Sequence, residues 1–372
     1  MRPWGRASTR HRRPRCCPDP CAQHRQRNLP KRAELRQDGR EPKEPPMSVP
    51  HATPAYSELV ASEVWRQEAT EWIEDTVGRL GYRVRGPLTQ PRIRPWSTQL
   101  VVPTDHGTVW FKAAGEPMRF EPGLQRLLAR LLPDLVASPL AVDTARGWML
   151  TADHGPLLAD DAAAAGDDLR EVVRVTARAQ RALVEHRDAL LATGMPDCSP
   201  STIPERFDQL LDALAALPPD LPSHLEPSEA DRFRARRAEL VDACAAMAES
   251  DFPTTFQHGD LHLKNAYRAG GATRLFDFGD AQWAAAVEVL AVPHAIVSGD
   301  PDGPSWSSLV ADYLAAWDLD HTTFGIAWNA SHFTHAVNRA FTWWRCLQSA
   351  TDDEWRQWGD APLAHLREMM RP

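Results

Sequence analysis

Apolar residues recur at helical spacing in the first well-patterned part of the chain. From Leu59 to Leu80 they return every three or four positions, and Gly81 follows where a C-terminal cap belongs. A leucine-rich stretch with the same spacing begins at Pro122, and proline is tolerated at the first position of a helix. We therefore predict one amphipathic helix over 59–80 and another that starts at Pro122.

Short apolar runs bounded by turn-forming residues lie on both sides of the leucine-rich stretch. Three β-like runs occur before it, near Tyr82–Leu88, Thr98–Pro103 and Thr108–Ala113, and Asp105-His106-Gly107 forms a tight turn between the last two. A fourth run, Gly147–Thr151, comes after it. These runs predict a small antiparallel sheet.

Beyond Asp168 the pattern is mostly helical. Ser228, with Asp231 three residues later, fits a capping box for a single helix that runs through Phe233 to Met247. The Pro-rich stretch 218–227 is predicted to be the loop before that helix. After residue 281, helical patterns recur in three stretches, near 305–317, 324–348 and 361–370. The expected fold class is α+β, with a small β part and a larger, mostly α part.

Residues 1–46 differ in composition from the rest of the chain. They are rich in Arg and Pro, poor in aliphatic residues, and end in a Glu-Pro-Lys-Glu-Pro-Pro run that neither helix nor strand accommodates. We expect a disordered tail over 1–46, and Met47, where the composition changes, is a candidate for the true start of translation. A basic arm that binds nucleic acid is the alternative for this tail.

The charge is unevenly distributed. Residues 1–46 carry 13 Lys and Arg against 5 Asp and Glu, whereas the remainder carries 29 against 45. An acidic body argues against nucleic-acid binding, which needs a basic surface. It suits a cationic small substrate. No apolar stretch approaches the roughly 20 residues of a membrane span, and no signal peptide is recognisable, so we expect a cytoplasmic protein without membrane contact.

Cysteine usage suggests neither a disulfide framework nor a metal site. Of the six cysteines, none shows metal-ligand spacing, and Cys244 and Cys346 fall within helical patterns. We expect both of these to be small buried hydrophobic residues.

The most informative segment is Phe256–Asp280. It places His258, Asp260, Asn265 and Asp277 in order within one short stretch. Gly270-Gly271 between two β-like runs predicts a hairpin that brings Asn265 and Asp277 to the same end of two paired strands. Two oxygen ligands would then converge on one cation.

Phosphoryl transfer needs a carboxylate that receives the acceptor hydroxyl's proton, together with hard oxygen ligands for Mg²⁺. Protein kinases place the catalytic Asp five residues before a metal-binding Asn and follow both with Asp-Phe-Gly. Here Asp260 and Asn265 are five apart, and Asp277-Phe278-Gly279 follows. The two matched spacings predict Asp260 as the base, with Asn265 and Asp277 as magnesium ligands.

The segment resembles the aminoglycoside phosphotransferase and choline-kinase-like superfamily, whose catalytic loop reads His-Gly-Asp-x-x-x-x-Asn. His258-Gly259-Asp260 and Asn265 carry the match. The resemblance implies a two-lobed protein-kinase-like fold, the cofactors ATP and Mg²⁺, and a small hydroxylated acceptor. It assigns His258 a largely structural role and covers about residues 55–372. The implied division is a nucleotide-binding lobe over 47–152 and a catalytic, acceptor-binding lobe over 153–372.

The same resemblance implies a phosphate-contacting ammonium on the third strand, held by a glutamate on the following helix. Lys112 fits this position and is the only lysine between residues 44 and 263. It lies in an apolar strand, where an unpaired ammonium is costly. Glu121 is the preferred partner, although it also suits the N-terminal helix dipole. Glu116 is the second choice.

Other nucleotide contacts are expected from loops. No Gly-x-Gly-x-x-Gly loop is present; Ser97 or Thr98, between the first two strands, could touch phosphate instead, or belong to an ordinary turn. The run Met149–His154, with Thr151 in it, would be the hinge whose backbone receives adenine. An ordinary strand end is the alternative there.

Two other functions remain open. His258, Asp260 and His262 could form the metal triad of a hydrolase, because alternate residues of an extended segment point the same way. The chain could also be a pseudokinase that binds nucleotide without turnover. If the chain is a kinase, His262 and Lys264 inside the catalytic loop could contact the acceptor or the γ-phosphate, or they could be merely structural.

The acceptor side is described only in outline by the sequence. Four acidic residues that follow the catalytic segment could line the approach of the acceptor: Asp280, Glu288, Asp300 and Asp302. Eight tryptophans follow residue 281, and most should be helix core, with one or two facing the cleft. The acceptor's identity, the choice between ATP and GTP and the oligomeric state cannot be read from the sequence.

Overall fold

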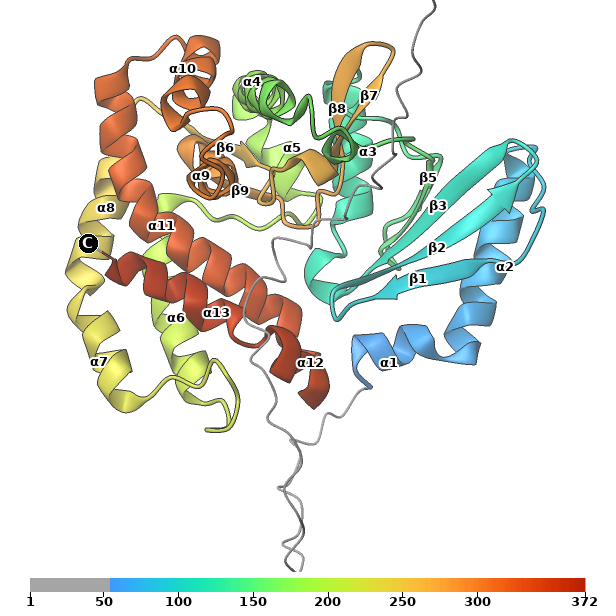
Figure 1. Cartoon of the computed structure of the whole chain (residues 1–372). Helices are drawn as coiled ribbons and strands as arrows, with labels where there is room; N and C mark the ends of the chain where they lie inside the picture. Colours follow the sequence, from blue (N-terminus) through green and yellow to red (C-terminus); the bar gives the residue numbers. More distant parts are fainter. Residues whose placement is uncertain (1–53, 372) are drawn as a thin grey trace, which may run out of the picture. The chain divides into compact units, whose positions relative to one another are not determined.

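The computed structural model describes residues 54–371 (Figure 1). The expectations for the tail 1–46 and for a start at Met47 therefore lie outside the described residues. The N-terminal part holds a five-stranded antiparallel sheet in the order β1-β2-β3-β5-β4. Its strands are β1 (Thr89–Ile93), β2 (Ser97–Thr104), β3 (Gly107–Ala114), β4 (Ala141–Asp143) and β5 (Trp148–Ala152). Helices α1 (Tyr56–Ala61), α2 (Glu63–Arg79) and α3 (Glu121–Leu131) accompany it.

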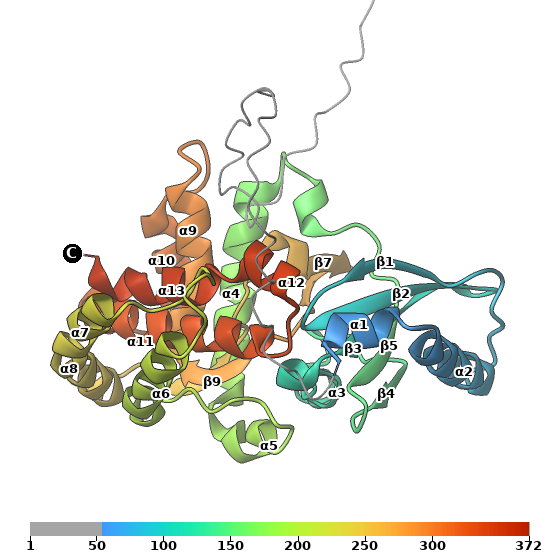
Figure 2. The same cartoon turned by 90° about the horizontal axis from the view of Figure 1, so that it is seen from below.

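The alternation of side chains along β3 separates a core face from a site face. Val109 and Phe111 are buried against α2, which runs beside the sheet (Figure 2). Successive side chains of a strand point to opposite faces. Lys112 therefore projects away from this core, from a position paired with Met149 of β5.

Two predictions in this part need correction. The helix expected over 59–80 is interrupted at Ser62, whose hydroxyl accepts a hydrogen bond from Trp65 N and so begins α2. The strand expected at Tyr82–Leu88 is reduced to one bridge between Val84 and Thr104, and the first strand is β1 instead. Proline is tolerated in β1 because this strand is at the sheet edge. The turn at 105–107 and the helix that begins near Pro122 are confirmed.

The C-terminal part is mostly helical. Its helices are α4 (Ala165–Leu183), α5 (Arg187–Leu191), α6 (Ile203–Ala215), α7 (Pro227–Ala235), α8 (Arg237–Glu249), α9 (Ala291–Ser298), α10 (Trp306–Trp317), α11 (His321–Leu347), α12 (Asp352–Trp358) and α13 (Ala361–Leu366). Two short antiparallel pairs complete it: β6 (Thr254–Gln257) with β9 (Gln282–Ala285), and β7 (Ala266–Ala269) with β8 (Ala272–Leu275). The predicted α+β class, with a small antiparallel sheet and a larger helical part, is confirmed.

The helix predicted to be capped by Ser228 is wrong in its start and its length. Pro227 opens α7, with Glu226 at the N-cap, so Ser228 lies inside the first turn. Proline is favoured there because its missing N–H has no partner to lose. The chain then breaks at Arg236, and α8 carries Met247 separately. The predicted burial of Cys244 and Cys346 is confirmed.

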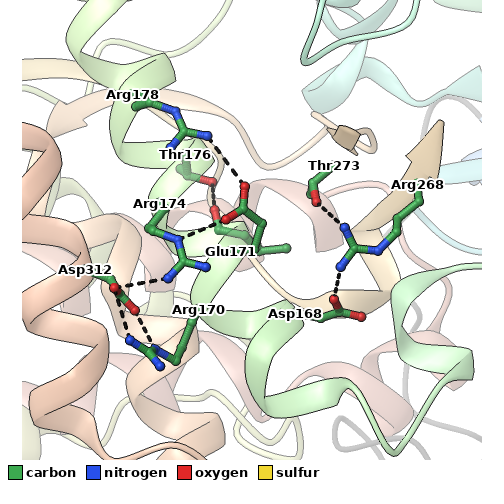
Figure 3. Close-up of polar contacts among 10 residues, drawn as sticks. Asp168, Arg170, Glu171, Arg174, Thr176, Arg178, Arg268, Thr273 and Asp312 are labelled. Carbon is green, nitrogen blue, oxygen red and sulfur yellow. Dashed lines mark hydrogen bonds and ion pairs between the residues drawn. The ribbon is translucent and has the colours of Figure 1, made fainter. Parts of the chain in front are cut away.

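Helix α4 holds the surroundings of the catalytic segment together. Gln180 is fully buried, and its amide nitrogen donates to Phe256 O and Ala286 O, at 3.0 Å each. At the start of the helix, Asp168 forms an ion pair with Arg268 of β7, as Figure 3 shows. One buried helix thus anchors β6, which leads into the catalytic segment, and the hairpin that follows. Within residues 54–371, none of the helices combines the length and hydrophobicity that a membrane span requires.

Candidate active site

The turn at the start of the catalytic segment depends on a glycine. Gly259 has φ +82°, and a Cβ atom there would collide with the backbone oxygen of Asp280. Glycine removes both the steric conflict and the strain of a positive φ. The backbone next to Asp260 therefore packs directly on the segment that follows Asp277.

The hairpin predicted around Gly270-Gly271 is present and has the expected consequence. Ala266 pairs with Leu275, and Phe276 N donates to Asn265 O at 3.1 Å, so Asn265 and Asp277 flank the same end of the two strands. The Asn265 amide nitrogen donates to Asp260 O at 2.9 Å. Its amide oxygen is then the atom left to bind a cation.

Lys112 lies between two carboxylates. Its Nζ is 2.7 Å from Glu121 Oε1 and 2.6 Å from Asp277 Oδ1. The predicted contact with Glu121 is therefore present, whereas Glu116 pairs with Arg119 at the surface. Burial alone would lower the pKa of Lys112, but the charges of Asp277 and Glu121 raise it above its ordinary value. Lys112 is a permanent cation in this setting.

The pKa values of the two carboxylates beside Lys112 shift in opposite directions. Burial raises the pKa of Glu121 to about 6, although Lys112 opposes the shift, and its Oε2 has no hydrogen-bond partner. Burial would also raise the pKa of Asp277, but the charge of Lys112 lowers it overall. Asp277 adopts the left-handed backbone conformation, with φ +62°, which costs on the order of 1 kcal/mol and is sustained by surrounding structure. An ionised Asp277 and the Asn265 amide oxygen form a donor set that fits a hard cation such as Mg²⁺.

Asp260 has two oxygens in different environments. Oδ2 is 3.2 Å from His262 Nε2 and 3.4 Å from Asn265 Nδ2, whereas Oδ1 faces Arg339 Nη2 at 3.9 Å. Burial would raise the pKa of Asp260, but the hydrogen bond from His262 and the charge of Arg339 lower it well below its usual range. Asp260 is therefore an ionised carboxylate with one oxygen lacking a short contact among these groups.

His258 has a structural position. It is fully buried, Nε2 lies 3.0 Å from Phe276 O, and burial lowers its pKa. A neutral ring that donates to a carbonyl cannot turn that nitrogen to a metal shared with Asp260 and His262. Among residues 54–371, no three His, Cys, Asp or Glu side chains are grouped to hold a metal ion. The metal-triad hydrolase is therefore not supported.

Arg339 of α11 is a site residue that sequence reasoning missed. Its Nη1 is 2.5 Å from Asp280 Oδ1, and its guanidinium lies over the Trp343 ring, 5.6 Å from the centroid. Its neighbours along the helix include the buried Ala336, Val337 and Ala340. A charged residue among such apolar positions is the signal that could have identified it.

The predicted phosphate-contacting hydroxyls are inside the sheet. Thr98 is fully buried; its hydroxyl donates to Arg92 O and accepts from Gln90 Nε2, both at 2.8 Å. This geometry favours the structural alternative for Thr98. Ser97 is also buried, at the start of β2 opposite Ala114.

A cavity of about 240 Å³ borders the predicted hinge. Thr151 and His154 contribute to its wall together with Tyr267 of β7. The His154 and Tyr267 rings are stacked, with centroids 4.3 Å apart. The cavity offers room and aromatic surface beside the segment that was expected to receive adenine.

The acidic residues proposed to line the acceptor approach divide into three cases. Glu288 is fully buried and accepts hydrogen bonds from Thr334 Oγ1 (2.6 Å) and Asn338 Nδ2 (3.1 Å), so its proposed place on the approach is wrong. Asp280 is bound to Arg339. Asp300 and Asp302 are exposed in the turn after α9.

Comparisons with known proteins address the family and the fold. Residues 110–326 match the family described as "Phosphotransferase enzyme family". No curated protein sequence matches the chain significantly.

Among solved structures, the chain is similar to an ethanolamine kinase of Plasmodium vivax, with 16% identity, a TM-score of 0.56 and coverage of 85% of this chain and 94% of that one. It is similar to a macrolide 2'-phosphotransferase type I, with 16% identity, a TM-score of 0.52 and coverage of 79% and 97%. For the choline kinase LicA of Streptococcus pneumoniae the values are 12%, 0.50, 82% and 99%. At these identities the similarity establishes the fold.

Proposed function

The chain belongs to the phosphotransferase enzyme family, and we propose that it transfers the γ-phosphate of ATP to a hydroxyl group of a small molecule, with Asp260 as the base. The observation that carries this proposal is that Lys112 pairs with Asp277, that Asn265 contacts Asp260, and that the β7–β8 hairpin places Asn265 and Asp277 at the same end of two strands. Strand β3, the β7–β8 hairpin and the turn at Gly259 position these four residues.

On the nucleotide side, Lys112 supplies a fixed positive charge for phosphate oxygens. Glu121 prevents this ammonium from moving away, because it is buried on α3 and within 2.7 Å of Nζ. The hinge region 149–154, with Thr151 and the cavity beside it, is the proposed site of the adenine ring. The proposed lobe boundary lies within this region, between residues 152 and 153.

Asn265 and Asp277 are the residues that would hold Mg²⁺, which supplies neutralisation of negative charge on the phosphates. Without Asn265 and Asp277 no Mg²⁺ would be held there, and Lys112 would be the only positive charge of this set beside the phosphates. Asp277 is already ionised, because Lys112 holds its pKa down.

On the acceptor side, Asp260 Oδ1 is the proposed proton acceptor. His262 and Asn265 engage Oδ2, so the carboxylate is oriented with its other oxygen available to a hydroxyl group. The lowered pKa of Asp260 keeps the carboxylate ionised, so that it can accept a hydrogen bond and then the proton from the acceptor hydroxyl. Positioning then contributes most of the rate enhancement, as is general in phosphoryl transfer.

The acceptor class is a small hydroxylated molecule. The similar structures include an ethanolamine kinase, a choline kinase and a macrolide 2'-phosphotransferase, whose named acceptors range from amino alcohols to macrolides. The structure does not favour a polycation at the base, because Arg339 neutralises Asp280 and Glu288 is enclosed.

The test is ADP release from Mg·ATP across a panel of amino alcohols, sugars, aminoglycosides and macrolides. We expect at least one acceptor to raise ADP release above the rate without acceptor, and Asp260→Asn to remove the increase. A protein that binds Mg·ATP but gives no increase with any acceptor class would support the pseudokinase alternative. Phosphorylated product identified by mass spectrometry then fixes the acceptor hydroxyl.

A further inference from the structure

Arg339 is held between two carboxylates at the edge of the proposed catalytic base. Nη1 lies 2.5 Å from Asp280 Oδ1, and Nη2 lies 3.9 Å from Asp260 Oδ1. Only 12% of the Arg339 side chain is exposed. A charge this buried is costly unless it is paired, so the ion pair with Asp280 is what permits Arg339 to be there.

Several independent contacts fix this position. Asp280 cannot recede from the catalytic turn, because its backbone oxygen packs on Gly259. Helix α11 cannot rotate freely, because Thr334, in the turn before Arg339, and Asn338, the residue next to it, donate hydrogen bonds to the buried Glu288. The place of Arg339 beside Asp260 is therefore built into the fold.

The two distances from Arg339 are unequal, and the inequality has a chemical meaning. At 2.5 Å the contact with Asp280 is a short charge-assisted hydrogen bond, whereas 3.9 Å to Asp260 Oδ1 exceeds hydrogen-bond length. At the longer distance the guanidinium still attracts the carboxylate, but it does not use the lone pairs of Oδ1. Oδ1 stays able to accept a hydrogen bond from an incoming hydroxyl.

We propose that Arg339 is a positioning residue for phosphoryl transfer: anchored on Asp280, it orients the Asp260 carboxylate while leaving Oδ1 open to the acceptor. The inference rests on the proposed role of Asp260. Asp280 acts as the anchor that keeps Arg339 from closing on Asp260. Lysine can replace the charge of Arg339 but not its planar fork, so it should restore only part of the function.

The test uses the full chain, with Mg·ATP as donor and water as the phosphoryl acceptor, so that it needs no identified acceptor. Turnover is measured by ADP release, nucleotide binding by titration with Mg·AMP-PNP, and folding by the melting temperature. The variants are Arg339→Met, Arg339→Lys, Asp280→Asn and the double variant Arg339→Met/Asp280→Asn. Arg356→Met is the matched control, because it removes an Arg–Asp pair of the same length, 2.5 Å, at the surface of α12.

We expect Arg339→Met to lower kcat by about 10- to 100-fold, the range for a misplaced reacting group, with the Mg·AMP-PNP Kd within about 2-fold of wild type. The kcat of Arg339→Lys should lie between those of wild type and Arg339→Met. Asp280→Asn should also lower kcat although Arg339 is intact, and the double variant should be no worse than Arg339→Met alone. Arg356→Met should match wild type. A purely structural role would not separate kcat from Kd in this way.

The opposite results are equally clear. If wild type exceeds Asp260→Asn in turnover but Arg339→Met equals wild type, the positioning role is wrong while the proposed function stands. If wild type does not exceed Asp260→Asn, the role of Asp260 fails and the inference fails with it. Should Arg339→Met not fold, wild-type kcat in both Arg339→Lys and Asp280→Asn would overturn the inference.

Discussion

Two groups with the same arrangement of charges include residues of the catalytic segment. The nucleotide-side group is Glu121, Lys112 and Asp277, and the acceptor-side group is Asp260, Arg339 and Asp280; each has one cation between two carboxylates. In the first, the cation contacts both partners at 2.7 and 2.6 Å. In the second it contacts one at 2.5 Å and stands 3.9 Å from the other.

This difference separates two tasks. In the proposed mechanism, Lys112 and Asp277 remain a charged pair until phosphate and metal share their charges, so short contacts on both sides of Lys112 suit this role. Asp260 is the proposed proton acceptor, so a neighbouring cation must not occupy its Oδ1. Two short contacts hold Lys112 against both of its carboxylates. One short and one long contact of Arg339 leave an oxygen of Asp260 open to a substrate.

The largest expected effect distinguishes the functions of the two groups. Asp260→Asn should abolish acceptor-dependent turnover, a loss of about 10²-fold or more for a general base, while Mg·ATP still binds. Asp277→Ala should weaken Mg·ATP binding as well, because it removes an oxygen ligand. The measurements are ADP release and nucleotide titration on each variant. Near-wild-type turnover in Asp260→Asn would remove the base from the proposal.

The second effect is on stability and concerns the nucleotide-side group. Lys112→Met leaves Glu121 and Asp277 facing each other without their cation, and breaking a buried pair costs about 3–5 kcal/mol. We expect the free energy of unfolding in urea to fall by about that amount. The control is Arg79→Met, whose exposed pair with Asp75 should contribute less than about 1 kcal/mol. If both variants lose the same free energy of unfolding, the ion pairs of Lys112 contribute no more to stability than an exposed pair.

The two groups also differ in how far the sequence predicted them. Asp277 and Asn265 could be placed together because Gly270-Gly271 predicts a local hairpin, and the apolar strand around Lys112 implied a partner such as Glu121. Arg339 could not be assigned to Asp280, because the two are 59 residues apart and meet only through helix packing. The buried contacts of Glu288 that set this packing carry no local sequence signal.

The same distinction explains the errors in the fold. The split at Ser62 was missed because Ser62 lies inside a continuous helical pattern, whereas at α7 the capping signal of Ser228 was preferred to Pro227, which opens the helix. The strand β1 was missed because its position at the sheet edge, which makes Pro91 acceptable, is a tertiary fact.

The third effect uses pH to test the buried contacts of Glu288, which hold α11 and with it Arg339 of the acceptor-side group. Burial raises the pKa of Glu288 from 4.5 to about 7, so the folded protein keeps a proton that the unfolded chain releases. The resulting stability is present below the unfolded pKa and is lost as pH rises through about 7.

Glu288→Gln does not titrate, so its free energy of unfolding relative to wild type should increase by about 2–3 kcal/mol between pH 5 and pH 8. Urea unfolding of both proteins at the two pH values measures it. Glu74→Gln, on the exposed side of α2, is the control. A relative stability that is independent of pH would mean that Glu288 is not held as the structure shows.

The smallest effect concerns the link between the two sides. Trp96, in the turn between β1 and β2, meets the edges of Trp343 and Trp358, with centroids 5.4 and 5.5 Å apart, and Trp343 lies under Arg339. Edge-to-face pairs contribute about 0.5–1.5 kcal/mol beyond the area they bury. A double-mutant cycle with Trp96→Leu and Trp358→Leu should therefore give a coupling energy of about 1 kcal/mol in urea unfolding. The matched cycle pairs Trp96→Leu with Trp72→Leu, because Trp72 packs on Phe111 and Trp148 instead, and its coupling should be near zero.

If both cycles give zero, the aromatic contacts of Trp96 do not couple the β1–β2 turn to α12. If only the first is coupled, the β1–β2 turn is tied to α12 through Trp96 and Trp358.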